Sequence, residues 1–131
     1  MDNARRIASA IAAFDTWIGA QDRNDGNAII DADVSGGLRM AFIDYAWSLS
    51  HTWETTPGLN QFVNTFAASF GGVLPAATEE VVDRIGALPQ QAIESIVHNI
   101  PDDFLSRADR QLVVGQLLQR RSTLRSVCGL P

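Results

Sequence analysis

Lysine is absent from this chain of 131 residues, and all ten basic residues are arginine. Cysteine occurs once, as Cys128, so an intramolecular disulfide is excluded. No apolar run approaches the roughly 20 residues that a membrane-spanning helix needs. The 15 acidic residues outnumber the basic ones and give a formal net charge of −5. This charge disfavours non-specific binding to nucleic acid, because such binding depends on neutralising phosphates.

The rest of the composition fits one globular domain. The hydrophobic content of 46% is ordinary, and a chain of this length can bury a real core. The first residues lead into an amphipathic helix that contains Asp15, a pattern that does not fit a signal peptide. With a single cysteine as well, we expect a cytoplasmic protein that does not associate with membranes.

Acidic and amide side chains gather between Phe14 and Trp47. A helix ends near residue 20. The chain then runs through a polar turn, an apolar run, a glycine-containing turn and a second apolar run, at residues 22–27, 28–30, 31–37 and 38–43. Two short apolar runs joined by such a turn predict a β-hairpin, and both of its faces are largely apolar. We therefore expect the hairpin to be wedged against helices.

Three oxygen-bearing side chains converge at the open end of this predicted hairpin. Asn27 precedes the first strand and Asp44 follows the second, and antiparallel pairing brings such positions together. Asp22 lies five residues before Asn27, on the loop that leads into the hairpin. Carboxylate and amide oxygens of this kind are suited to Mg²⁺, which takes a few protein oxygens and completes its coordination with phosphate.

Several strings resemble the HipA-like kinase family. DRNDGN at 22–27 and IDYA at 43–46 resemble the DRHxxN catalytic loop and the IDxG metal-binding turn of HipA-like and phosphoinositide-type kinases. FDTWI at 14–18 is similar to the FDxWIxxxDR string of HipA-like proteins. Near the end, ALPxxAIxxIVxxIPDDF followed by LLxRRxxL resembles their closing pattern. The resemblance spans nearly the whole chain.

The resemblance implies that residues 1–131 form one domain, the C-terminal lobe of a protein-kinase-like fold. The implied reaction is transfer of the γ-phosphoryl group of ATP to a hydroxyl of a protein Ser or Thr or of a small molecule. Asp22 would be the catalytic base. Asn27 and Asp44 would bind the Mg²⁺ ions that hold the nucleotide. Asn24 stands where the family has His, and Tyr45-Ala46 replaces a pair ending in Gly.

The N-terminal ATP lobe of such kinases has no counterpart in these residues. Only about twenty residues precede Asp22, they read as helix, and neither a Gly-rich loop nor a phosphate-binding lysine is present. The chain alone should therefore be a poor catalyst. It could be one subunit of a split kinase completed by an N-lobe-like partner protein, a fragment, or a binding module that keeps the metal site without chemistry.

Other interpretations of the same residues remain. Asp, Asn and Gly are favoured in turns, so residues 22–27 could form a plain turn. An ion pair with Arg23, rather than a metal, could neutralise Asp44. The spacing of a calcium-binding EF-hand is not met, because Gly26 comes one place early and a hairpin follows. The chain could also be a non-catalytic helical protein-interaction module with a structural polar loop.

Two neighbouring residues are expected to support the loop. Arg23 should brace it by pairing with a carboxylate or with backbone carbonyls. Asp15 should cap or orient it.

The remainder of the chain is predicted to be helical, which makes the fold mainly α with one β-hairpin (α+β). Apolar residues at three- and four-residue steps predict the helices, and Gly or Pro marks their ends. In the final helix, Leu112 and Leu124 are expected to face inward. The predicted helices cover about 2–20, 59–70, 78–88, 90–99 and 108–127.

Overall fold

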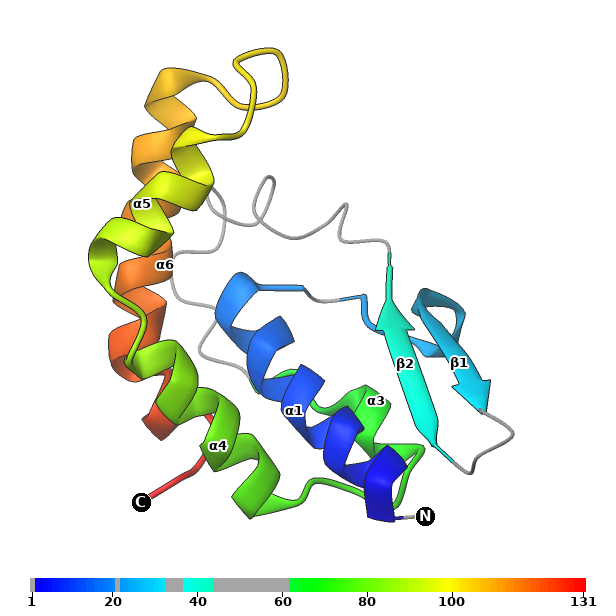
Figure 1. The fold of residues 1–131 in the computed structure, drawn as a ribbon. Coiled ribbons are helices and arrows are strands. Elements are labelled where there is room, and N and C mark those ends of the chain that lie inside the picture. Colours follow the sequence, from blue (N-terminus) through cyan, green and yellow to red (C-terminus); the bar gives the residue numbers. More distant parts are fainter. Residues whose placement is uncertain (1, 21, 33–36, 44–61) are drawn as a thin grey trace.

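The computed structural model describes residues 2–20, 22–32, 37–43 and 62–131, and this part of the chain is mainly helical with one antiparallel hairpin (Figure 1). Asp44 lies outside the described residues. None of the helices in the described part combines the length and apolarity that crossing a lipid bilayer requires. The elements are α1 (Asp2–Ile18), the 3₁₀ turn η1 (Asp25–Asn27), β1 (Ala28–Ala32), β2 (Leu38–Phe42), α3 (Thr65–Ala68), α4 (Pro75–Gly86), α5 (Gln90–His98) and α6 (Arg107–Val127).

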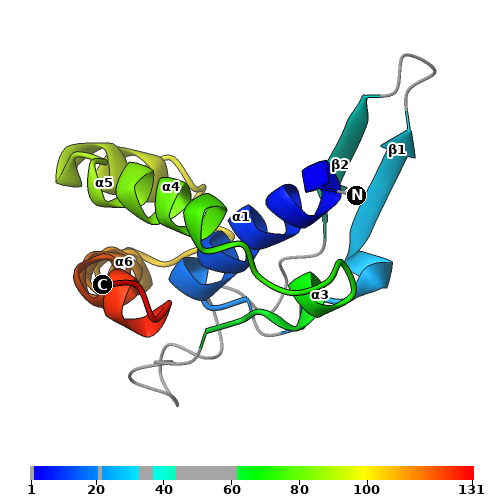
Figure 2. The same cartoon turned by 90° about the horizontal axis from the view of Figure 1, so that it is seen from below.

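Helix α1 is the central element. It contacts α3, α4, α6 and β2, and it lies between the α4–α6 helices on one side and the hairpin with α3 on the other (Figures 1 and 2). Its apolar residues recur at helical spacing, so two sides of the helix can be buried at once. The loop that begins after α1 therefore starts from a helix that is packed on two sides.

Two clusters form the core. The larger one joins the C-terminal half of α1 to α4, α5 and α6, with Trp17, Val113 and Leu124 among its buried members. The indole Nε1 of Trp17 donates a hydrogen bond of 3.0 Å to the backbone carbonyl of Leu117. The smaller cluster joins the N-terminal half of α1 to α3, and Phe42 of β2 packs against it.

Glycines with positive φ end the two long helices in the same way. After α1, Gly19 has a φ of +72°, and the N–H of Ala20 donates 2.9 Å to the carbonyl of Asp15. After α6, Gly129 has a φ of +68°, and the N–H of Leu130 donates 3.0 Å to the carbonyl of Arg125. Both are Schellman motifs, in which a left-handed residue closes the helix. The predicted stop of the first helix at Gly19 is confirmed.

Arginine side chains donate to backbone carbonyls where the chain changes direction. Arg5 bonds to two carbonyls between α3 and α4, Arg121 to one between α4 and α5, and Arg110 to one between α5 and α6. Arg125 bonds to the carbonyl of Pro131 and also pairs with two carboxylates of α4. A chain without lysine thus uses guanidinium groups to satisfy carbonyls that lie outside helices.

Some predicted boundaries were wrong. The helix expected over 59–70 is limited, among described residues, to α3. The N–H of Val63 bonds to Thr16 Oγ1 at 2.9 Å, which holds residues 62–64 outside the helix. Helix α4 begins at Pro75 rather than Thr78, since proline suits a first helical turn. Leu112 was expected inside but is 38% exposed.

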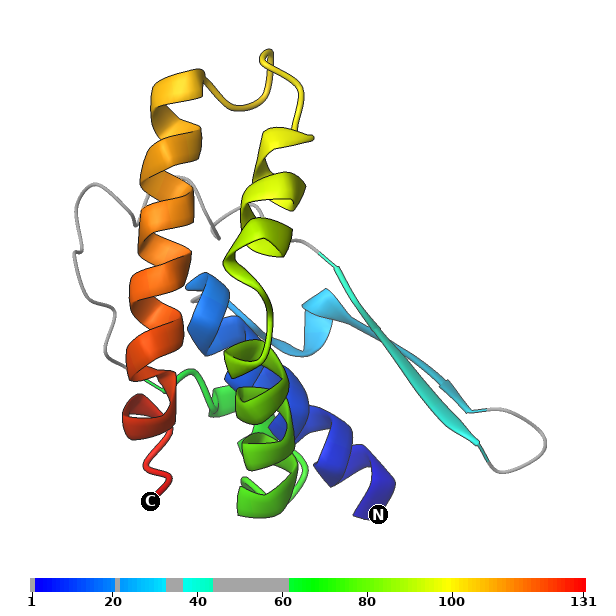
Figure 3. The same ribbon diagram turned by 60° about the vertical axis from the view of Figure 1, so that its left-hand side comes forward.

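The hairpin packs through one face only. Strands β1 and β2 pair with Ala28 opposite Phe42 and Ile30 opposite Met40. On the packed face, the ring of Phe42 meets that of Phe66 edge-on, with centroids 5.8 Å apart. The hairpin thus lies against helices as expected, but Ile29, on the opposite face, is 55% exposed, so one of its two apolar faces is left largely uncovered. Figure 3 shows the strands projecting away from the helices.

Candidate functional site

The predicted catalytic-type loop is shaped by side-chain amides that bond to its own backbone. Asn24 Oδ1 accepts from the N–H of Gly26 at 2.8 Å, and Asn24 Nδ2 donates to the carbonyl of Asp22 at 2.8 Å. Asn27 Nδ2 donates to the same carbonyl at 3.1 Å. These bonds fold the loop into the 3₁₀ turn η1 that leads into β1. The bonds from Asn24 and Asn27 hold the loop through the backbone carbonyl of Asp22, not through its carboxylate.

This arrangement gives Asn24 a structural role. The short amide of Asn24 makes both a donor and an acceptor bond within the loop. An Asn that bonds to the backbone two residues on is favoured in such turns. Asn24 therefore braces the loop from within.

Arg23 and Asp15 form a buried ion pair behind the loop. Nε of Arg23 lies 2.7 Å from Oδ2 of Asp15, and Nη2 lies 3.0 Å from Oδ1. The side chain of Asp15 is fully buried and that of Arg23 is 2% exposed. Two parallel bonds of this kind are the strongest pairing between arginine and a carboxylate. Asp15 thus joins helix α1 to the loop.

The guanidinium of Arg23 also contacts the residues that flank β1 and β2 at the open end of the hairpin. Its Nη1 donates to the carbonyl of Asn27 at 2.9 Å and to that of Ile43 at 3.2 Å. The ring of Phe42 lies 5.2 Å from the centre of the guanidinium, within the range of a cation–π contact. The prediction that Arg23 braces the loop through a carboxylate and carbonyls is confirmed, and so is the prediction that Asp15 orients it.

The electrostatic balance at Asp15 depends on Arg23. Burial raises the pKa of Asp15 above its ordinary value of 3.8, because a carboxylate loses solvation in the core. The hydrogen bond and the charge of Arg23 act in the opposite direction, and the charge of Asp22 raises the pKa further. In the described part of the chain, Arg23 is therefore the group that favours the ionised form of Asp15.

The hairpin register brings Asn27 to the end of the second strand, as the sequence predicts. The N–H of Ile43 donates to the carbonyl of Asn27 at 3.0 Å and continues the ladder of β1 and β2. Asp44, the next residue in the chain, lies outside the described part. Since Asn27 Nδ2 is turned toward Asp22, the amide oxygen of Asn27 is the end that could face a cation. Within the described ranges no three His, Cys, Asp or Glu side chains form a metal-binding group.

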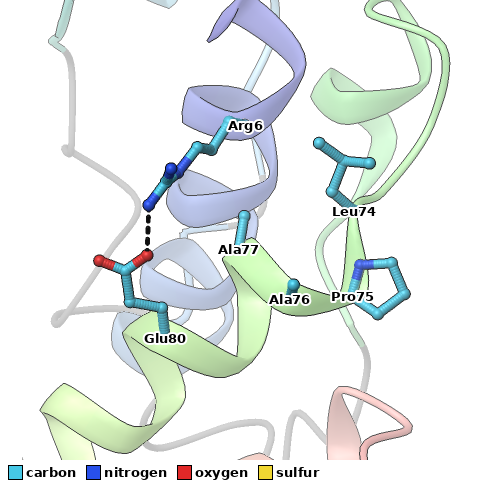
Figure 4. A pocket seen from close by; sticks show the side chains of 6 residues that line it. All are labelled: Arg6, Leu74, Pro75, Ala76, Ala77 and Glu80. Atoms are coloured by element: carbon cyan, nitrogen blue, oxygen red, sulfur yellow. Dashed lines mark hydrogen bonds and ion pairs between the residues drawn. The ribbon is translucent and has the colours of Figure 1, made fainter. Parts of the chain in front are cut away.

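Two cavities bear on the position of a site. One of about 250 Å³ opens beside the loop and is lined by polar and aromatic side chains of the loop and of the α3 region: Arg23, Asn24, Asp25, Thr65, Phe66 and Ser69. Another, of about 310 Å³, lies between α1 and the start of α4, where Arg6 and Glu80 form an ion pair of 2.7 Å (Figure 4). No residue of the loop lines the cavity of Figure 4, whereas Arg23, Asn24 and Asp25 of the loop line the first cavity.

Sequence reasoning did not identify which carboxylate pairs with Arg23. The signal was present, because Asp15 lies four residues after Ile11 and three before Ile18, on the buried side of an amphipathic helix. An acid at such a position requires a partner, since an isolated buried charge is very costly. Nothing in the sequence indicates that Thr65 and Ser69 line the cavity beside the loop, because only the tertiary fold brings α3 to the loop.

Comparison with known proteins adds no assignment. No family model, no curated protein and no solved structure matches this chain. The functional argument therefore depends on the loop, the hairpin register and the resemblance of their residues to a kinase motif.

Proposed function

We propose that this chain is the catalytic-loop lobe of a HipA-like phosphotransferase. The observation that carries the proposal is the pairing of Asn27 with Ile43, which puts Asp44 next in the chain after the partner of Asn27. Asp22 belongs to the same braced loop, and its backbone carbonyl accepts a bond from the side chain of Asn27. Three acid or amide groups thus come from one loop and the hairpin end that is bonded to it.

The residue types fit Mg²⁺ and the phosphates of ATP. Asn27 offers an amide oxygen and Asp44 a carboxylate, and both are hard oxygen ligands. When bound, Mg²⁺ supplies positive charge that neutralises the phosphates during transfer. Asp22 would accept the proton of the attacking hydroxyl, as the corresponding Asp does in kinase-type sites. The acceptor would be a hydroxyl of a protein or of a small molecule.

The outer face of the hairpin supports a nucleotide in particular. Ile29 and Ile43 are 55% and 44% exposed, and Ala41, which pairs with Ile29, is exposed as well. Asn27 adjoins this apolar surface at its polar end. A purine ring could cover the isoleucines while its phosphates reach Asn27, and this would remove apolar area from water.

Catalysis by this lobe would need groups from a second component. The sequence has no lysine and no Gly-rich loop to cover the phosphates, and phosphoryl transfer depends largely on positioning and charge neutralisation. An N-lobe-like partner protein would supply them.

The test is calorimetric titration of the chain with ATP, with and without Mg²⁺. We expect Mg²⁺-dependent binding that falls at least about tenfold in Asn27→Ala and Asp44→Ala, because each loses one oxygen ligand. Asp22→Asn should keep the binding and lose only transfer activity once a partner is supplied. Asp31→Ala is the matched control, since Asp31 lies on the hairpin opposite Arg39, away from its open end. Binding unaffected by Asn27→Ala and Asp44→Ala would contradict the proposal.

A second candidate is a non-catalytic helical interaction module. It is favoured by the internal use of the loop's polar groups, since Arg23, Asn24 and Asn27 all bond to the backbone of the loop or the hairpin. In that case Asp44→Asn would change the free energy of unfolding without changing any affinity for Mg²⁺ or ATP. The same titration therefore separates the two functions.

A further inference from the structure

We propose that Asp15 and Arg23 form a positioning pair, which sets the relative placement of Asp22, Asn27 and Ile43 at the open end of the hairpin. The catalytic role of Asp22 and the metal-binding role of Asn27 rest on the proposed function. The positioning itself rests on contacts that the structure contains, and it can be tested without a nucleotide. Neither Asp15 nor Arg23 is expected to touch substrate.

Arg23 is connected to each of the three positions, either as the neighbouring residue in the chain or by a hydrogen bond. It directly follows Asp22, so fixing its backbone fixes that of its neighbour. Its Nη1 holds the carbonyl of Asn27 at 2.9 Å. The same nitrogen holds the carbonyl of Ile43, which directly precedes Asp44, at 3.2 Å. One planar group therefore ties together the loop and both strands at the open end of the hairpin.

Only arginine can make this set of contacts. Its guanidinium directs Nε and Nη2 toward Asp15 while Nη1 points away toward the two carbonyls. A lysine ammonium is a single point that could not span the carboxylate and the strands together. Phe42 lies against the guanidinium at 5.2 Å and limits its tilt.

Asp15 connects this group to the rigid core. Its side chain is fully buried on α1, and its backbone carbonyl accepts the bond from Ala20 that closes the helix. Two residues along, Trp17 is hydrogen-bonded to α6. The packing of α1 in the core therefore fixes the position of Arg23, because two hydrogen bonds join Arg23 to Asp15. The exact geometry of the loop then depends on core packing rather than on loop residues alone.

The two residues can be weakened in complementary ways. Asp15→Asn keeps the shape of the side chain but removes its charge, so Arg23 loses its counter-ion and keeps its carbonyl bonds. Arg23→Lys keeps a positive charge beside Asp15 but cannot hold both carbonyls. Arg6→Gln is the matched control, because Arg6 is also on α1 and also bonds a carboxylate at 2.7 Å, but in an exposed pair with Glu80.

The first measurement is amide hydrogen exchange in the full chain, which reports local opening. The probe is the N–H of Ile43, which donates to the carbonyl of Asn27. In both Asp15→Asn and Arg23→Lys we expect its exchange to accelerate at least about tenfold while the amides of α6 are unchanged. Arg6→Gln should leave the exchange of Ile43 as in the wild-type chain. Unchanged exchange of Ile43 in the two variants would overturn the inference.

The second measurement is the gain in ATP affinity that Mg²⁺ produces. A merely structural loss would weaken ATP binding with and without Mg²⁺ alike, whereas misplaced metal ligands reduce the Mg²⁺-dependent part. We expect that part to fall about tenfold in both variants, as for mutation of groups that support metal ligands. A full Mg²⁺ effect in variants whose hairpin end has opened would overturn the inference.

The two measurements also separate this inference from the proposed function. If the wild-type chain binds no ATP with Mg²⁺, the proposed function fails, and the exchange of Ile43 still decides whether the pair positions the loop. If Asp15→Asn does not fold, Arg23→Lys decides alone. Unfolding of both variants, seen as loss of helical circular dichroism, would overturn the inference, because the pair would then be needed for the whole fold rather than for local placement.

Discussion

Replacing Gly19 by alanine tests how closely the end of α1 approaches α6. Gly19 has a φ of +72°, and a Cβ built on it would lie 2.1 Å from Nη1 of Arg120. Arg120 is 6% exposed, so its guanidinium is enclosed at this point. The Gly19→Ala variant must therefore adopt a left-handed backbone with a side chain and also displace a buried group.

The expected cost has two parts. An L-residue with a side chain in the left-handed region costs about 1–2 kcal/mol, and the stiffer unfolded chain returns about 0.4–1 kcal/mol of this. Forcing extra volume into a packed site costs about 1–3 kcal/mol more. We therefore expect Gly19→Ala to lower the free energy of unfolding by about 3 kcal/mol. With a urea slope near 2 kcal/mol per M, the midpoint falls by about 1.5 M.

Gly129→Ala is the matched control for this experiment. Gly129 has nearly the same φ, +68°, and closes α6 through the same type of motif, but a Cβ built on it meets nothing within 4 Å. The Gly129→Ala variant should lose only the backbone contribution to the free energy of unfolding, about 1 kcal/mol. Urea unfolding followed by circular dichroism at 222 nm measures both. Equal losses in the two variants would show that the Arg120 side chain moves aside at no cost, and would refute the reasoning.

Two further predictions concern the C-terminal half. Burial raises the pKa of the Cys128 thiol to about 11, against 9.0 in an exposed thiol, so the folded state keeps a proton that the unfolded state releases. The contribution of the thiol to the free energy of unfolding is complete below pH 9 and falls by about 1.4 kcal/mol per pH unit between pH 9 and 11. Urea unfolding at pH 8 and at pH 10.5 measures this fall, and the Cys128→Ala variant should lack it. Ser106 caps α6 by accepting from the N–H of Asp109, so Ser106→Ala should cost about 1 kcal/mol in thermal unfolding. Ser122→Ala, on the exposed side of the same helix, should cost almost nothing, and equal losses would contradict the cap.

Local signals predicted much of the fold. The stop at Gly19 follows from its freedom to adopt positive φ, and the hairpin from apolar runs on either side of a glycine-containing turn. Two helix boundaries were predicted wrongly, one because a tertiary contact determines it and the other because proline is ambiguous. Val63 is held by Thr16 of another helix, and Pro75 marks a helix start although proline also occurs in connectors.

The candidate site shows the same division. Asp22 and Asn27 are recognisable from sequence because their spacing lies within one loop, and the hairpin register follows from the pattern of strands and turn. The pairing of Arg23 with Asp15 could not be derived from the sequence, because it depends on the path of α1 through the core. The kinase-like assignment of the lobe remains a prediction.

The arginine bonds at the turns make the connections of this fold insensitive to pH. A guanidinium stays protonated across the range in which carboxylates and histidines titrate, and the carbonyl it holds does not titrate at all. Acid would therefore weaken the exposed ion pairs that Arg6 and Arg125 make with α4, while the carbonyl bonds of Arg5 and Arg121 persist. Partial acid unfolding should separate helices from one another before it changes the course of the turns between them.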